Sequence, residues 1–326
     1  MIPSKLILAP MDGVIDAPMR RVLTSSCRYD YCESEFVRVS GQCVTSSRLL
    51  SMVPELRCGG VTAAGTPVYV QILGQEPEIC AASAELACRL GAPGIDLNFG
   101  CPARQVNKSG GGAALLKDPD LMHGICCRVR DVVPAGIPLT AKMRLGWDSS
   151  DRCLELAEQI WSAGVDALCV HGRTREDGYA TGTVRWDLIA RIREACPVPV
   201  IANGDVFDRA SAMECSRITG CDSLMLARGA VSLPNLADVI RLDAEPFSYR
   251  RMVEAVVAFT EAFREYSPDR DPFPRVKQFL SYLRGYYNAM VSLNIFRRVC
   301  ACGSLAEAIS LLQSSTAEAD QLEPEA

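Results

Sequence analysis

Short apolar runs rich in β-forming residues recur along the chain, and this repetition most limits the folds that the sequence can adopt. Between successive runs there is room for a helix that carries the chain back to the start of the next strand. Eight such runs predict parallel strands joined by right-handed crossovers and closed into a TIM (β/α)8 barrel. The runs are Leu6–Met11, Tyr31–Val39, Val68–Leu73, Gly94–Asn98, Leu139–Arg144, Ala167–His171, Val198–Ala202 and Ser223–Ala227.

The stretches between the runs support this alternation. Helical composition and periodicity are found in Glu78–Leu90, Asp118–Val132, Asp151–Ala163, Trp186–Ala195 and Ala210–Ile218. A doubly wound open sheet is the alternative fold. Polar or small residues cluster just past the carboxyl ends of nearly all the runs, which favours the barrel because its active-site loops lie there.

The strand pattern stops near Asp243, and helical stretches take over. They are Tyr249–Tyr266, Arg275–Tyr287 and Leu305–Leu312. We therefore expect a barrel of residues 1–243 followed by a small C-terminal helical domain of residues 244–313. Residues 314–326 are acidic and small, so we expect a disordered tail.

Composition narrows the class of protein. A chain of 326 residues, 48% hydrophobic and 22% charged, is long enough for one barrel and a small appendage. No basic leader opens it and no stretch approaches the roughly 18 apolar residues of a membrane span, so we expect a cytoplasmic protein without membrane association. The 16 cysteines lack Cys-x-x-Cys spacing and only two histidines occur, which predicts neither a metal site nor a disulfide framework.

Charge is distributed unevenly although the net charge is −5. Residues 246–302 hold nine Lys or Arg against five Asp or Glu, whereas residues 303–326 hold five acidic residues and no basic one. The basic segment interleaves Arg275, Lys277, Arg284, Arg297 and Arg298 with Phe279, Tyr282, Tyr286 and Tyr287. Such a mixture suits the phosphates and base faces of RNA. A solvated helix face with tyrosines packed beneath it explains the pattern as well.

Three strand ends carry chemistry. Cys101 follows an apolar run and is flanked by Gly100 and a proline, which favours an active thiol over one more buried cysteine. Lys142 lies in an apolar strand and needs an anion, either an electron-rich cofactor or a carboxylate such as Asp96. His171 ends a strand, whereas the other histidine, His123, falls within a helical stretch and is interpreted as structural.

The last two runs end in small and polar residues. Asn203-Gly204-Asp205 and Ala227-Arg228-Gly229 follow them. Loops in these positions often bind phosphate in barrels, because glycine exposes backbone N–H groups and lets an anion approach. Ordinary turns between strand and helix are the alternative.

Five segments together resemble the tRNA-dihydrouridine synthases, in order and over nearly the whole chain. They are Ala9–Gly13, Leu97–Pro102, Lys142–Trp147, His171–Thr174 and Ile201–Asp205. Two more, Glu35–Arg38 and Arg275–Leu283, are most similar to the bacterial DusC branch, which the resemblance links to uridine 16 of the tRNA D-loop.

The resemblance implies an FMN-bearing barrel that uses NADPH to reduce the C5–C6 double bond of a D-loop uridine in tRNA, with Cys101 as the proton donor. It implies cofactor contacts by Pro10, Met11, Asp12, Gln71, Lys142, His171, Asn203, Gly204, Asp205, Ala227 and Arg228. It implies tRNA contacts by Arg38, Asn98, Arg275, Lys277, Tyr282 and Arg298.

Two other functions remain open from the sequence. An FMN-dependent barrel reductase of a small molecule, such as a free pyrimidine, would share the cofactor strand ends. A tRNA-binding protein that assists folding without catalysis would share the basic segment. Besides tRNA binding, we expect no membrane association, no metal and a monomeric protein.

Overall fold

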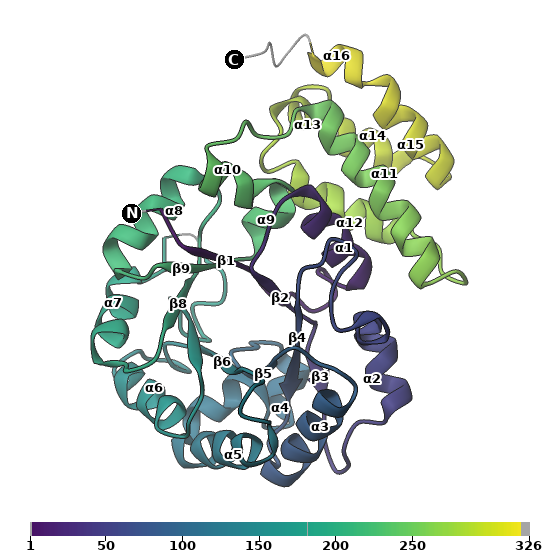
Figure 1. Ribbon diagram of the computed structural model, residues 1–326. Helices are drawn as coiled ribbons and strands as arrows, with labels where there is room; N and C mark the ends of the chain where they lie inside the picture. The colour runs from purple at the N-terminus through teal and green to yellow at the C-terminus, as the bar shows by residue number, and fades with distance from the viewer. Residues whose placement is uncertain (1, 181, 321–326) are drawn as a thin grey trace.

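The computed structural model describes residues 2–180 and 182–320, and its centre is a closed barrel of eight parallel strands (Figure 1). β1 pairs with both β2 and β9, and β2 pairs with β4, so the ring has no free edge and the open-sheet alternative is wrong. The barrel strands are β1 (Lys5–Leu8), β2 (Tyr31–Glu33), β4 (Val68–Leu73), β5 (Ile95–Phe99), β6 (Leu139–Arg144), β7 (Ala167–His171), β8 (Val200–Asn203) and β9 (Ser223–Leu226).

The expected strand Tyr31–Val39 is divided, which corrects the prediction. β2 ends at Glu33, and a separate short strand, β3 (Val37–Arg38), pairs with the far end of β4. Ser34 explains the break, because its hydroxyl accepts the backbone N–H of Gln71 at 3.1 Å in place of a backbone carbonyl. The chain therefore leaves the sheet after β2 and rejoins it at the rim.

Helices form the outer layer, and the five that the sequence predicted between the strands are confirmed to within a few residues. They are α3 (Pro77–Arg89), α5 (Pro119–Val132), α6 (Cys153–Trp161), α7 (Trp186–Ala195) and α8 (Arg209–Thr219). Prolines open α3 and α5, where a missing N–H costs nothing. Further short helices are α1 (Ala17–Ser26), α2 (Ser46–Met52), η1 (Pro54–Cys58), α4 (Arg104–Lys108), η2 (Gly112–Lys117), α9 (Arg228–Ser232) and α10 (Leu236–Leu242).

The inside of the barrel differs between its two halves. Ile7, Cys169, Ile201 and Met225 form a small apolar cluster on one side, apart from the main core between strands and helices. On the other side, neighbouring strands place polar side chains in register, with Gln71 beside Asp96, Asp96 beside Thr140, and Asn98 beside Lys142. Paired residues of parallel strands face the same side of the sheet, so these groups share the interior.

The C-terminal helices stack against one flank of the barrel, shown in green to yellow in Figure 1. α11 packs on α1, and Arg21 of α1 pairs with Glu265 of α11 at 2.5 Å. The expected helix Arg275–Tyr287 ends at Leu283 in a turn. The helices are α11 (Tyr249–Tyr266), α12 (Phe273–Leu283), α13 (Asn288–Ser292), α14 (Ile295–Ala301), α15 (Leu305–Ser314) and α16 (Thr316–Asp320).

The expected disordered tail is wrong for its first part. Thr316–Asp320 forms α16, because Ala319 is buried and the Tyr249 and Ser315 hydroxyls hydrogen-bond at 2.9 Å. Residues 321–326 of that prediction lie outside the described residues. Among the helices of residues 2–180 and 182–320, none is long and apolar enough to cross a lipid bilayer.

Candidate active site

A cavity of about 530 Å³ opens at the carboxyl ends of the barrel strands. Most residues to which the sequence assigned a role line it: Pro10, Met11, Asp12, Asn98, Cys101, Lys142, His171, Asn203, Gly204, Asp205, Ala227, Arg228 and Tyr282. Tyr282 comes from α12, so the helical domain forms part of the wall. The strand ends and α12, one of the C-terminal helices, thus converge on one space.

Cys101 faces this cavity on a loop whose backbone is held on both sides. Its N–H donates to Asn98 Oδ1 at 2.9 Å, and its carbonyl accepts from the Ala113 N–H at 3.0 Å and from Asn107 Nδ2 at 2.9 Å. Burial raises the pKa of the Cys101 thiol, so it stays protonated at neutral pH. Cys101 is half-buried, whereas most other cysteines, such as Cys126, are fully enclosed.

Lys142 points across the cavity floor. Its Nζ donates to Asn203 Oδ1 at 3.1 Å, while Asn203 Nδ2 donates to the Met225 carbonyl at 2.8 Å. Within the described residues no ion pair joins Lys142 to Asp96, whose two oxygens accept from Gln71 and Thr140 instead. The salt-bridge alternative is therefore wrong, and the ammonium group remains available to a ligand.

The loops after β8 and β9 meet at Asp205. The Asp205 carboxylate pairs with Arg173 at 2.5 Å and with Arg228 at 2.7 Å, so its charge is matched by two guanidinium groups. The Asp205 backbone is left-handed, with φ of 54°. A Cβ on Gly229 would lie 2.2 Å from the Val206 carbonyl oxygen, so the two loops approach as closely as glycine allows. Excess positive charge and exposed backbone here suit an anion.

His171 lies buried beside these cations. Burial, together with the charges of Arg144 and Lys142, lowers the pKa of His171 well below its ordinary value. The imidazole is thus neutral at physiological pH and offers one donor and one acceptor.

Two cavity residues, Arg144 and Tyr179, received no role from the sequence. Arg144 is buried, and its Nε donates to the Gly100 carbonyl at 2.8 Å. The Tyr179 ring lies 5.2 Å from the Arg144 guanidinium and 5.3 Å from that of Arg228. Arg144 follows Lys142 by two residues and so shares its face of β6, a signal that the sequence contained. Tyr179 sits on a long loop, and no sequence pattern marks it.

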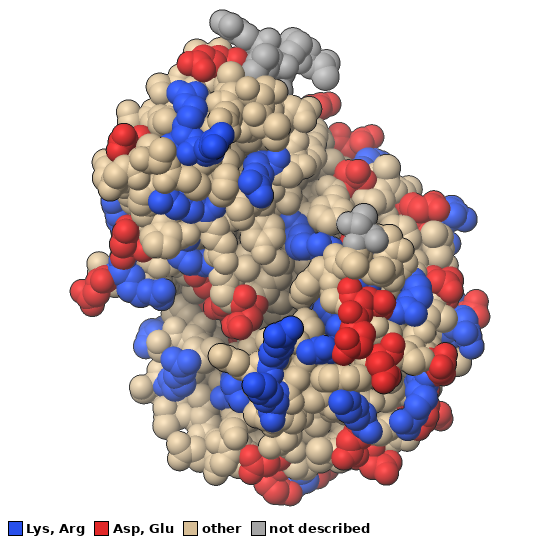
Figure 2. Space-filling view, turned by 180° about the vertical axis from the view of Figure 1, so that it is seen from behind, with Lys and Arg blue, Asp and Glu red and all other residues tan. Residues whose placement is uncertain are grey.

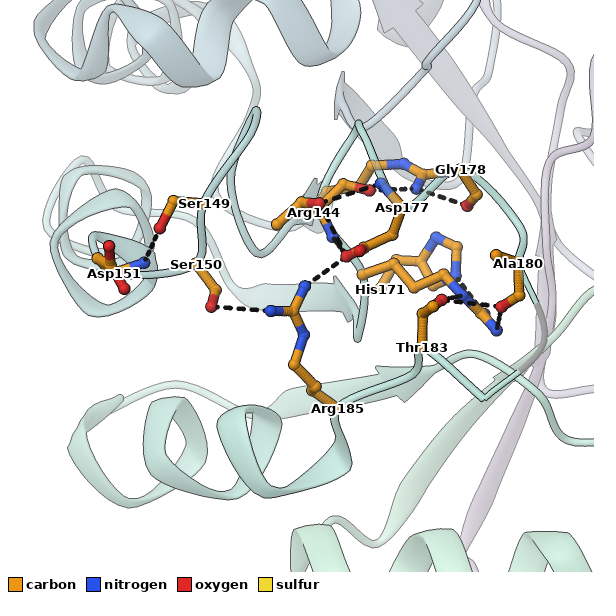
Figure 3. A network of polar contacts seen from close by, with 12 residues as sticks. Arg144, Ser149, Ser150, Asp151, His171, Asp177, Gly178, Ala180, Thr183 and Arg185 are labelled. Atoms are coloured by element: carbon orange, nitrogen blue, oxygen red, sulfur yellow. Dashed lines mark hydrogen bonds and ion pairs between the residues drawn. The ribbon is translucent and has the colours of Figure 1, made fainter.

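The loop that carries Tyr179 is tied to the rim by a polar network (Figure 3). Arg144 donates to the Gly178 carbonyl at 3.0 Å. Arg185 bridges Asp177 and Ser150, the latter at 3.1 Å, so it joins the loops after β6 and β7. These ties hold an exposed aromatic ring at the mouth of the cavity.

Comparison with known proteins identifies the family to which the chain belongs. A family model described as Dihydrouridine synthase (Dus) matches residues 7–308. The chain belongs to the dihydrouridine synthase family. The resemblance seen in the sequence is therefore confirmed.

Curated relatives of this family member are similar over nearly their full lengths. A tRNA-dihydrouridine(16) synthase of Shewanella oneidensis is 46% identical over 87% of this chain and 90% of the relative. A tRNA-dihydrouridine(16) synthase of Salmonella typhimurium is 40% identical over 95% of this chain and 99% of the relative.

Solved structures match in fold alone. Histamine dehydrogenase from Rhizobium sp. 4-9 aligns with a TM-score of 0.57 at 13% identity, covering 79% of this chain and 49% of that one. A variant of NCR from Zymomonas mobilis aligns with a TM-score of 0.53 at 14% identity, covering 74% of this chain and 87% of that one.

Some residues that the resemblance assigned to cofactor or tRNA lie outside the cavity of this dihydrouridine synthase family member. Gln71 is completely buried beneath Asn98. Arg38 is exposed on β3 and donates to Ser109 Oγ at 2.6 Å. Lys277 lies 3.9 Å from the centre of the Phe273 ring, and Arg298 lies 4.0 Å from Glu318.

Arg275 has a different setting from the other basic residues of the helical domain. Its guanidinium donates to the Val14 carbonyl at 2.9 Å and to Asp16 Oδ2 at 2.8 Å, and it also contacts the Gly13 carbonyl. Arg275 therefore fastens α12 to the loop after β1, next to the cavity.

In the part of the chain that the structure describes, no group of three or more His, Cys, Asp and Glu side chains is placed to hold a metal ion.

Proposed function

We propose that this protein reduces the C5–C6 double bond of uridine 16 in the D-loop of tRNA, with FMN as bound cofactor and NADPH as reductant. The observation that carries the proposal is the half-buried thiol of Cys101, which lines a cavity at the barrel mouth together with several cationic side chains. The names of the curated relatives support tRNA as the substrate and position 16 as the target.

The residues of the cavity fit a phosphate-bearing aromatic cofactor. The loops Asn203–Asp205 and Ala227–Gly229 would hold its phosphate through backbone N–H groups and Arg228. Lys142 and neutral His171 would lie along its ring system. The chemistry that a bound FMN supplies is hydride delivery to the uracil ring, with NADPH restoring the reduced form.

Cys101 completes the reduction. Addition of hydride at C6 must be matched by a proton at C5, and the Cys101 thiol supplies it from Sγ. Because burial keeps the proton on sulfur at neutral pH, Cys101 is a competent general acid. The resulting thiolate lies near the positive charges of Arg144 and Lys142, and it regains its proton from solvent.

Uridine must leave the folded tRNA to reach this cavity, since a stacked base cannot contact the bottom of a barrel mouth. We assign the holding of the displaced RNA to Arg38, Asn98, Arg275, Lys277, Tyr282 and Arg298. Figure 2 shows Lys and Arg gathered on the lobe formed by the C-terminal helices, with a hollow between that lobe and the barrel. Basic groups beside a concave mouth suit an RNA backbone.

The test is position-resolved mass spectrometry of an unmodified tRNA transcript incubated with the purified protein, FMN and NADPH. Dihydrouridine at position 16 is expected. Dihydrouridine at another D-loop position would overturn the proposed site, and none at any position would overturn the reaction. Reduction of free uridine or uracil, but not of tRNA, in a parallel incubation would support the small-molecule reductase. Binding of tRNA without any reduced product would support the non-catalytic folding protein.

A further inference from the structure

A chain of buried polar side chains leads from the barrel interior to Cys101. Asp96, on β5, is completely buried and does not line the cavity. Its Oδ1 accepts from the Thr140 hydroxyl at 2.6 Å, and its Oδ2 accepts from Gln71 Nε2 at 2.7 Å. Gln71 Oε1 in turn accepts from Asn98 Nδ2 at 2.7 Å. Asn98 Oδ1 then accepts the backbone N–H groups of Gly100 at 3.0 Å and Cys101 at 2.9 Å.

Each link sets the orientation of the next. The Gln71 amide nitrogen faces two carboxyl oxygens, one from Asp96 and one from Glu33 at 3.2 Å, which fixes its oxygen toward Asn98. That oxygen needs a donor, so Asn98 must present its nitrogen to Gln71 and its oxygen to the Cys101 loop. Reversing either amide would place donor against donor or acceptor against acceptor, and buried groups pay the full cost of such a mismatch.

The two carboxyl groups are not equivalent. Burial and the neighbouring Asp96 charge raise the pKa of Glu33 well above its ordinary value, whereas burial raises the pKa of Asp96 to about 6. Asp96, both of whose oxygens accept hydrogen bonds, is therefore the more easily ionised of the two. Lys142 is the cation that acts on both groups. An ionised carboxylate is the stronger acceptor, so Asp96 carries the orientation of Gln71.

We propose that Asp96 is a positioning residue that holds the backbone of Cys101 in place through Gln71 and Asn98. The resemblance implies that Gln71 contacts the cofactor, and the hydrogen bonds of Gln71 in addition join Asp96 to Asn98. The catalytic consequence rests on the proposed function. The restraint on the Cys101 loop does not, and it can be measured without cofactor or tRNA.

The experiment compares Asp96→Ala with Asp96→Asn. Asp96→Ala removes the shorter of the two hydrogen bonds that Gln71 Nε2 donates and leaves only the longer one to Glu33 at 3.2 Å. Asp96→Asn keeps the shape and offers Gln71 an amide oxygen, while its nitrogen donates to the Thr140 hydroxyl, so it should preserve the relay. Thr24→Val is the matched control, because it removes a buried hydrogen bond of 3.0 Å to Thr62 outside the relay.

The first readout is the rate of iodoacetamide alkylation at Cys101, followed by peptide mass spectrometry, with half-buried Cys88 and Cys196 as internal references. Asp96→Ala should raise the Cys101 rate about fivefold or more by freeing its loop, with the references unchanged. Asp96→Asn and Thr24→Val should leave that rate within about twofold of the wild type.

The second readout is dihydrouridine formation at saturating tRNA. Asp96→Ala should lower kcat about tenfold or more with little change in KM, since Asp96 is buried and does not line the cavity. Asp96→Asn should restore most of kcat. If Asp96→Ala does not fold, Gln71→Met breaks the next link and should show the same increase in Cys101 alkylation.

An unchanged Cys101 alkylation rate in a folded Asp96→Ala or Gln71→Met protein would overturn the inference. Equal changes at Cys101, Cys88 and Cys196 would also overturn it, because general loosening would then explain them. A wild-type protein that forms no dihydrouridine would instead contradict the proposed function and leave the alkylation result to decide the relay.

Discussion

The barrel mouth and the helical domain both border the cavity, but they hold their polar residues differently. At the mouth, charged groups are buried and tied to one another, as Arg173 is to Asp205 and Lys142 is to Asn203. In the helical domain, basic residues such as Arg284 and Arg297 stand exposed on helices that pack through their apolar faces. A reaction that makes and breaks covalent bonds needs side chains in fixed positions. Electrostatic attraction of a phosphate backbone needs only positive charges that can approach it.

Arg275 crosses this division. It belongs to α12, yet its guanidinium is held by the loop after β1. We therefore expect Arg275 to couple the two regions, and Lys277, on the same helix, to act through charge.

The largest effect is expected at Cys101. Cys101→Ala should lower dihydrouridine formation by at least about 10²-fold, because no other thiol lines the described cavity and a positioned general acid contributes this much. Single-turnover assays with tRNA measure it. Exposed Cys58 provides the control, and Cys58→Ala should keep wild-type activity. A Cys101→Ala protein with normal turnover would remove the thiol from the reaction.

The next largest effect should follow from filling the narrow gap between the loops after β8 and β9, to which we assign the FMN phosphate. A Gly229→Ala methyl would meet the Val206 carbonyl and push the loops apart, so FMN affinity should fall about tenfold or more. Fluorescence titration with FMN measures it. Gly124→Ala is matched, because its Cβ would meet nothing within 4 Å, and FMN affinity should not change. Equal FMN affinity in Gly229→Ala and the wild type would contradict the assignment of these loops.

A smaller effect concerns acid stability at the mouth. The folded protein keeps His171 neutral, whereas an unfolded histidine takes up a proton near pH 6.5, so acid favours the unfolded chain. His171 should lower the free energy of unfolding by up to about 1.4 kcal/mol for each pH unit below about 6.5. Urea unfolding at pH 5 and pH 7.5 should show a flatter dependence in His171→Asn. An identical pH dependence of unfolding in His171→Asn and the wild type would show that other groups cause the acid sensitivity.

The smallest effect is expected from the basic residues of α12, Lys277 and Arg275. Lys277→Ala should weaken tRNA binding severalfold and reduce the magnitude of the slope of log K against log salt by about 0.7 to 0.9, with Tm unchanged. Arg275→Ala should lower Tm as well, since it also unfastens α12 from the barrel. Salt titrations of tRNA binding and thermal melts measure both. A lower Tm in Lys277→Ala and an unchanged Tm in Arg275→Ala would show that Arg275, and not Lys277, acts through charge alone.

Periodicity explains why the barrel could be predicted. The apolar run Val68–Leu73 forms a strand with the bounds that its sequence predicted. The helices Trp186–Ala195 and Tyr249–Tyr266 also have the predicted bounds. The prediction failed at Ser34, where a side-chain hydroxyl accepts a backbone N–H that a carbonyl of the neighbouring strand would otherwise accept. It also failed at Thr316–Asp320, a polar segment that is helical because it packs against the rest of the protein. Neither event leaves a periodic signal.

Local patterns and the order of residues along the chain were enough to predict the fold class, the family and the placement of Cys101, Lys142 and His171 near the carboxyl ends of strands. Which side chains contact one another could be seen only in the folded protein. The structure buries Gln71 beneath Asn98, fastens Arg275 to the loop after β1 and places Tyr179 in the cavity wall. It also links Asp96 to Cys101 through Gln71 and Asn98. Hydrogen bonds between distant residues depend on strand register and barrel closure, and no local pattern records either of them.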